Sequence, residues 1–119
     1  MKYLLMIYGN PATWDSWTDE DYAEVIRAHR AVQKDLIESG ELIGSEGLTT
    51  IGARTVRVNG DLPVVTDGPF TEAKEYLAGY YLVDCASVER ATEIATRLPE
   101  ARHNPIEVRR IMDKSEIGM

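Results

Sequence analysis

Hydrophobic residues recur along this chain with two different spacings, and the spacing changes from one segment to the next. Residues 2–8 are apolar at nearly every position, which is typical of a strand covered on both faces. From residue 18 to about residue 39 the apolar positions follow a period of about 3.6 residues, so this segment is predicted to be a helix with one buried stripe. The stripe holds Tyr22, Val25, Ile26, Val32, Leu36 and Ile37, with His29 and Gln33 in its middle.

Short polar segments mark where these elements begin and end. Residues 9–17 are predicted to form a loop. Thr18 and the three acidic residues after it favour a helix start, because the hydroxyl can cap free amides and the carboxylates stabilise the positive end of the helix dipole. Gly40 is expected to end that helix in a left-handed conformation.

The second half of the chain is predicted to hold most of the strands. They are expected at residues 41–48, 55–59, 62–66, 79–85 and 106–112. The two shortest are joined at Asn59-Gly60, a dipeptide that tolerates the positive φ angles of a tight hairpin turn. A second helix is expected to start at Ser87 and end before Pro99, with Val88, Ala91, Ala95 and Leu98 as its apolar stripe.

This order of elements predicts an α+β fold, a ferredoxin-like two-layer sandwich with an antiparallel sheet and both helices on one face. The strands at residues 2–8 and 79–85 are apolar on both faces, yet two helices cover only one. A second copy packed sheet to sheet would cover the other, so we expect a homodimer, a dimeric α+β barrel. Residues 1–112 are predicted to form one domain, and residues 113–119 a loose C-terminal tail.

Composition narrows the classes of partner and cofactor. At 119 residues and 13.3 kDa the chain is predicted to hold one core. A net charge of -7 disfavours direct nucleic-acid binding, and no apolar run is long enough for a membrane span.

The N-terminus runs straight into a strand without a cleavage site, which favours the cytoplasm. Cys85 is the only cysteine and is expected to be a small buried side chain rather than a reactive thiol. No metal-ligand spacing, phosphate loop or nucleophile elbow is present, so we expect no cofactor.

His29 and Asp67 are the candidate catalytic residues. An imidazole within an apolar stripe needs a polar partner: His29 either completes the core by bonding a backbone group of the sheet or Gln33, or lines a pocket as a general base. Asp67 opens a turn in which Gly68 and Pro69 constrain the backbone. It either accepts hydrogen bonds from amides of that turn, or is displayed toward the pocket where it orients His29.

Four aromatic or charged positions complete the candidate site. Trp14 and Trp17 either pack against the rim of the domain or form a lid on the pocket. The tyrosines of the strands are expected in the core or the dimer interface, with Tyr8 the best candidate for substrate contact because it ends a central strand. Lys74 lies in a charged turn and is a candidate for holding an anionic substrate group.

The segment Val-Thr-Asp-Gly-Pro-Phe-Thr-Glu-Ala-Lys-Glu at residues 65–75, followed by Gly-Tyr-Tyr-Leu-Val at 79–83, resembles the signature of the DGPF family, a branch of the YCII-related proteins. Residues 1–9, 40–48 and 106–110 support the resemblance over nearly the whole chain. It implies the dimeric α+β barrel, and it matches His29 to a helix histidine eleven positions before a glycine, here Gly40. The few studied relatives suggest lyase- or isomerase-like chemistry with a His and Asp pair.

Two functions from different classes follow. The first is a small enzyme that transfers protons on a small organic molecule without a cofactor. The second is a non-catalytic module that binds a ligand or a protein, because DGPF proteins often occur beside alternative sigma factors of the extracytoplasmic-function type. A pocket that holds His29 and Asp67 together would favour the enzyme.

Overall fold

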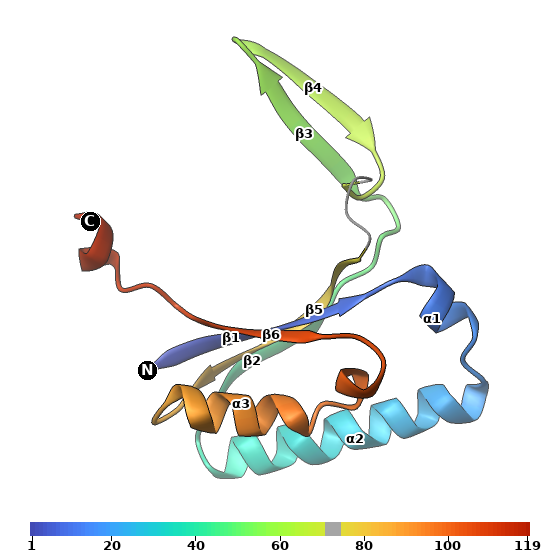
Figure 1. Ribbon diagram of the computed structural model, residues 1–119, viewed down its shortest axis with the longest axis vertical. Helices are drawn as coiled ribbons and strands as arrows, with labels where there is room; N and C mark the ends of the chain where they lie inside the picture. The colour runs from blue at the N-terminus through green and yellow to red at the C-terminus, as the bar shows by residue number, and fades with distance from the viewer. Residues whose placement is uncertain (71–74) are drawn as a thin grey trace.

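A four-stranded antiparallel sheet in the order β2-β5-β1-β6 forms the centre of the molecule, in a computed structural model that describes residues 1–70 and 75–119. Helices α2 and α3 cover one face of the sheet (Figure 1). This is the predicted ferredoxin-like α+β arrangement, and it is confirmed. The elements are β1 (Lys2–Gly9), α2 (Asp19–Glu38), β2 (Leu42–Gly47), β5 (Tyr76–Asp84), α3 (Val88–Thr96) and β6 (Ile106–Arg110).

Helix α2 begins and ends as its sequence predicts. The Thr18 hydroxyl accepts a hydrogen bond from the amide of Asp21, and the Asp21 carboxylate accepts one from the amide of Thr18, so each side chain caps the other residue's backbone. The chain leaves the helix through Gly40, whose φ of 78° is in the left-handed region.

The segment predicted as a loop before α2 contains a short helix, α1 (Pro11–Asp15). The Asn10 side chain accepts from the amide of Thr13, and Pro11 occupies the first turn, where its missing amide proton costs nothing. Asn10 is a helix-capping residue, as Thr18 is, and Pro11 is a residue favoured in the first turn of a helix. The expectation of a loop was therefore wrong because these signals were overlooked.

The core lies between the helices and the inner face of the sheet. Its buried members are Tyr3, Leu5, Ile7, Val32, Leu36, Tyr81, Val83, Cys85, Ala91, Ile94, Ala95 and Leu98. The predicted stripe of α2 was too wide, since Tyr22, Ile26 and Ile37 are exposed, and α3 buries Ile94 rather than Val88. A stripe read from periodicity does not show how far the sheet reaches across each helix.

Two strand boundaries also differ from the prediction. β5 starts at Tyr76, three residues before the predicted start at residue 79, and β6 ends at Arg110 rather than at residue 112. β5 is extended because Tyr76 and Leu77 pair with the end of β1, past an irregularity between Ile7 and Tyr8. Strand ends are set by the partner strand, which local sequence does not reveal.

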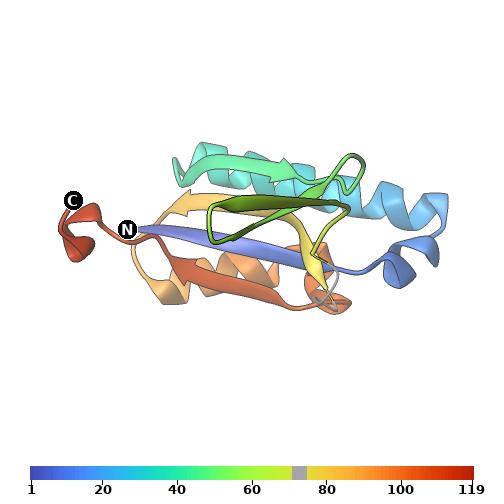
Figure 2. The same cartoon turned by 90° about the horizontal axis from the view of Figure 1, so that it is seen from above.

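Strands β3 (Arg54–Asn59) and β4 (Leu62–Asp67) form a separate two-stranded hairpin. Its turn has Gly60 at a φ of 59°, which fits the predicted Asn-Gly turn. Figures 1 and 2 show the hairpin rising from one end of the sheet on the side away from the helices. We call that side of the sheet the outer face.

The last residues form a short 3-10 helix, η2 (Lys114–Ile117), at the opposite end of the molecule from α1 (Figure 1). Arg110 holds it through two hydrogen bonds to Glu116, of 2.6 and 2.9 Å. All of its residues are exposed. Among the helices that the structure describes, none combines the length and apolar character needed to cross a membrane.

Candidate active site

A cavity of about 290 Å³ lies between the inner face of the sheet and the helical segments that cover it. Helix α2 supplies His29 and Gln33, β5 supplies Tyr81, and the 3-10 helix η1 (Pro99–Arg102) supplies Glu100. The remaining lining residues are Ile7, Trp14, Trp17, Ser45, Glu46, Gly47, Ala78, Gly79 and Tyr80. None of the lining residues is a lysine or an arginine, so this part of the chain offers no strong cation to an anionic ligand.

His29 bridges a carboxylate and a phenol in this cavity. Its Nε2 lies 2.7 Å from Oε2 of Glu100, and its Nδ1 lies 2.7 Å from the Tyr81 hydroxyl. Gln33 donates from Nε2 to the same hydroxyl at 3.1 Å. The imidazole and phenol rings are stacked, with centroids 5.7 Å apart. His29 is therefore held at both ring nitrogens, and its orientation is set by three different elements.

With Glu100 as a carboxylate and His29 as a neutral imidazole, the donors and acceptors of this network fit one arrangement of protons. An ionised Glu100 can only accept, so Nε2 of a neutral His29 carries the proton and donates it to Oε2. Nδ1 is then an acceptor and receives the Tyr81 hydrogen, while the phenol oxygen accepts from Gln33. Both ring nitrogens of His29, the Tyr81 hydroxyl and Nε2 of Gln33 have partners in this assignment, which supports a stable, partly buried polar network.

Burial raises the pKa of Tyr81, and the nearby negative charge of Glu100 acts in the same direction. Hydrogen bonding with Gln33 and Ser45 lowers the pKa of Tyr81 but does not cancel the shift. Tyr81 is therefore a neutral phenol near pH 7 that can give up its proton only when it receives another. The other carboxylate oxygen of Glu100, Oε1, is buried and accepts no hydrogen bond within the described part of the chain.

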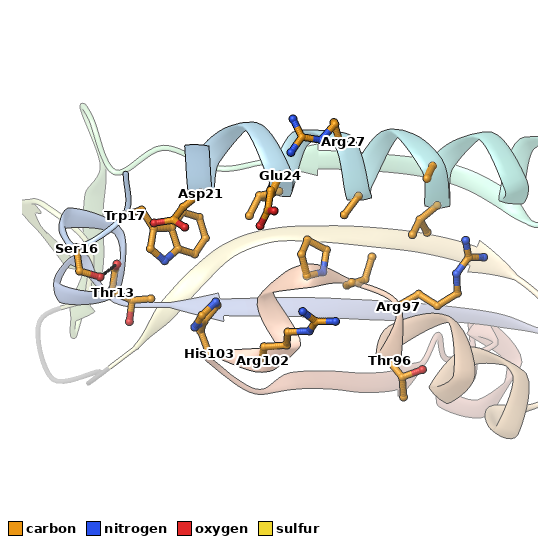
Figure 3. A pocket seen from close by; sticks show the side chains of 16 residues that line it. Thr13, Ser16, Trp17, Asp21, Glu24, Arg27, Thr96, Arg97, Arg102 and His103 are labelled. Atoms are coloured by element: carbon orange, nitrogen blue, oxygen red, sulfur yellow. Dashed lines mark hydrogen bonds between the residues drawn. The ribbon is translucent and has the colours of Figure 1, made fainter. Parts of the chain in front are cut away.

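A second, larger hollow of about 990 Å³ runs between α2 and the segment formed by α3 and η1. Figure 3 shows Trp17 and His103 facing each other at one end of it; their ring centroids are 5.7 Å apart. Arg97 lies toward the other end, where it is paired with Asp35 at 2.6 Å. Its labelled polar side chains come from α1 and the residues after it, from α2 and from the α3–η1 segment; most are exposed, and they form no connected network like that around His29. We therefore place the candidate active site at His29.

Three of the predicted site residues, His29, Trp14 and Trp17, line the same cavity. Trp14 packs edge to face on Tyr76, with ring centroids 5.5 Å apart, and lies against Gly9 so closely that a side chain at residue 9 would clash with it. Trp17 lines both hollows. The tryptophans thus pack on the rim of the domain and also border the cavity, so the two alternatives for them are compatible.

The other predicted site residues that the structure describes do not line the cavity around His29 within one chain. Tyr8 is on the outer face, where its hydroxyl is 3.4 Å from Glu107. Asp67 is exposed at the end of β4, and Gly68 and Pro69 follow it at the base of the hairpin; none of them lines either hollow. Lys74 lies outside the described residues. One chain does not bring Asp67 to His29, and that pairing stays a prediction for an assembly with a second chain.

Sequence reasoning did not find Glu100 and did not select Tyr81. Glu100 sits 71 residues from His29, in a segment where an acidic residue after Pro99 reads as a helix start. Tyr81 was assigned to the core or the interface, and it is 99% buried, so that assignment was accurate about burial and missed its hydroxyl. The sequence carries no signal that links the Tyr81 hydroxyl to His29, because their contact depends on how the strand and the helix pack.

The fold and the cavity define a ferredoxin-like α+β protein with a carboxylate, an imidazole and a phenol linked between its sheet and its helices. Comparison with known proteins agrees with this class: the family model of the YCII-related domain matches residues 1–115. The chain belongs to the YCII-related family. It is also similar to an uncharacterised protein of Rhizobium meliloti (strain 1021), with 37% identity over 102 residues that cover 85% of this chain and 82% of the relative.

Proposed function

We propose that this protein is a small enzyme that moves a proton on a small organic molecule without a cofactor. The observation that supports the proposal is the network of Glu100, His29 and Tyr81, joined by two contacts of 2.7 Å at the wall of a cavity. A base oriented by a carboxylate on one side, and joined to an acid on the other, is the arrangement that proton transfer requires.

The occupied nitrogens of His29 determine how it would act. A substrate proton passes to the oxygen of Tyr81 while the phenol hydrogen moves to Nδ1 of His29. The phenol is unchanged in charge, so its raised pKa does not oppose the step. The imidazolium that forms lies beside the Glu100 carboxylate, which stabilises it. Returning the proton to another substrate atom completes an isomerisation; loss of a leaving group instead completes an elimination.

The lining of the cavity supports a small and uncharged substrate. Its volume of about 290 Å³ is at the small end of ligand pockets. Trp14 and Trp17 offer flat apolar walls, and Glu100 would repel an anion. A neutral carbonyl compound with a proton on the neighbouring carbon fits these walls and this chemistry.

Deuterium exchange provides the test without a known substrate. The protein is incubated in D₂O with a panel of small neutral ketones and 1,3-dicarbonyl compounds, and uptake of deuterium at carbon is followed by mass spectrometry. We expect catalysed exchange with at least one compound, and a loss of about 10²-fold or more in His29→Gln and Tyr81→Phe, because each removes one member of the relay.

A Thr92→Ala variant is the matched control, since the Thr92 hydroxyl is exposed and bonds only to the backbone of its own helix. It should exchange at the wild-type rate. Full activity in a folded His29→Gln variant would refute the relay. Compounds that bind in the cavity of the wild-type protein without any exchange would favour the alternative of a ligand-binding module.

We propose further that the protein works as a homodimer through the outer face of the sheet and resides in the cytoplasm. Leu4, Met6, Tyr80 and Leu82 lie on that face as two cross-strand pairs and are only partly buried in one chain. An apolar row across the centre of a sheet is typical of a surface that another chain covers. Cys85 is free and buried, which suits a reducing compartment.

A further inference from the structure

The β3–β4 hairpin has one apolar face and one polar face. Cross-strand partners lie on the same face of an antiparallel pair, and Val56 pairs with Val65 while Val58 pairs with Pro63. These four residues make the valine face, on which Val56, Val58 and Val65 are 62%, 63% and 53% exposed. The opposite face is mixed: it holds two threonines, an asparagine, an arginine that lies over an aromatic ring, the half-buried Val64, and Leu62 near the tip.

Nothing in residues 1–70 and 75–119 covers the valine face. The two strands of the hairpin make no substantial contact with any other described helix or strand. A two-stranded hairpin alone in water is marginally stable, and one with an uncovered apolar face is a site for association. Its exposure therefore needs a partner outside the chain.

The surface area shows that the chain exposes enough surface for a large contact with a partner. The chain exposes 8333 Å², whereas a compact monomer of its mass exposes about 6,450 Å², an excess of about 1,900 Å². Its radius of gyration is 16.6 Å, against about 13.5 Å for a compact domain of this length. A stable complex needs about 800 Å² from each partner, so the excess is sufficient for a large interface.

The position of the hairpin indicates which partner fits. It rises from the end of the sheet beyond the outer face, so a second copy seated on that face would lie alongside it (Figures 1 and 2). In a two-fold dimer each chain contributes one hairpin and one outer face, and all four surfaces are covered at once. An unrelated partner would have to supply a match for both surfaces.

We propose that the β3–β4 hairpin is a clasp, whose valine face closes on a second copy of the chain seated on the outer face of the sheet. This inference rests on the proposed homodimer and is independent of the proposed catalysis. The clasp explains why a short hairpin with three exposed valines is kept apart from the core of its own chain.

The test compares two faces of the same hairpin. The double variant Val56→Thr/Val58→Thr keeps side-chain shape and strand propensity but places hydroxyls on the valine face. We expect the dimer dissociation constant, measured by analytical ultracentrifugation over a dilution series, to rise roughly tenfold or more because these hydroxyls lose water in the interface. Leu62→Thr is the control, since Leu62 is 67% exposed on the opposite face, and its dissociation constant should stay close to wild type.

Hydrogen exchange of the hairpin amides provides a second measurement that does not depend on any variant. In the wild-type protein, exchange in β3 and β4 should slow as the concentration rises through the dissociation constant. A dimer that forms equally well with the valine variant, or whose hairpin amides exchange as fast as in dilute monomer, would overturn the clasp and leave the sheet-face dimer standing. A wild-type protein that stays monomeric at micromolar concentration would overturn both, and would leave the enzyme proposal to its own test.

Discussion

Replacing Tyr81 with phenylalanine tests whether the network around His29 is formed. The variant keeps the ring, which is 99% buried, and removes only the hydroxyl. The contacts with Nδ1 of His29 at 2.7 Å and with Gln33 at 3.1 Å are lost, together with the hydrogen bonding to Ser45. Nδ1 of His29 and the amide of Gln33 then lose this partner in a partly buried place, whereas Nε2 of His29 keeps Glu100.

The expected loss can be estimated from these two contacts. Leaving a buried donor or acceptor unpaired costs about 1–3 kcal/mol, and removing a hydroxyl from a buried position recovers part of it. We expect the free energy of unfolding to fall by about 1–2 kcal/mol, which for a chain of this length lowers the melting temperature by about 4–8 °C.

Tyr3→Phe is the matched control. Tyr3 is also buried on the inner face of the sheet, but its hydroxyl reaches only the sulfur of Met1, at 4.0 Å. A thioether is a weak acceptor, so this change should cost less than about 0.5 kcal/mol. Both variants are melted at one protein concentration and followed by circular dichroism, because association shifts melting temperatures. If Tyr81→Phe is as stable as Tyr3→Phe, the network is not formed and the relay fails with it.

Two further predictions concern positions outside the cavity. Hydrogen bonds from Arg90 at 2.8 and 3.0 Å lower the pKa of Glu41 from its ordinary value of 4.5. The pair therefore stabilises the fold fully at a pH above 4.5, and this stabilisation is lost as the pH falls further and Glu41 becomes protonated. In urea unfolding at pH 7, Glu41→Gln should lower the free energy of unfolding by about 0.5–1 kcal/mol. The difference in unfolding free energy between the variant and wild type should shrink below pH 4.5, and a difference that stays constant with pH would contradict the prediction. Gly68 has a φ of 96° with no atom near its missing Cβ, so Gly68→Val should cost several degrees of melting temperature through backbone strain alone. Gly47→Val, in a strand with open space, should cost little, and equal effects of the two changes would mean that strain at Gly68 is absent.

The amino-acid sequence alone determined the elements and their order. The period of the apolar positions located both main helices and the central strands, because burying one face of a helix or both faces of a strand imposes those spacings. Caps and turns were equally local: Thr18 with Asp21, Gly40, and Asn59 with Gly60 lie where the prediction placed a helix start, a helix end and a hairpin turn. The family could also be recognised, because its signature is a contiguous stretch of chain.

Only the tertiary structure decided which partner His29 has. The prediction stated correctly that a histidine in an apolar stripe needs a polar partner, and named Asp67 and Gln33 among the candidates. The structure instead joins His29 to Tyr81 and Glu100, which lie 52 and 71 residues away. These contacts depend on the strand order and on where the chain turns after α3. The spacing of apolar residues within one strand or one helix carries no information about either. Local physics determines the elements, while the chemistry of this cavity arises where three of them meet.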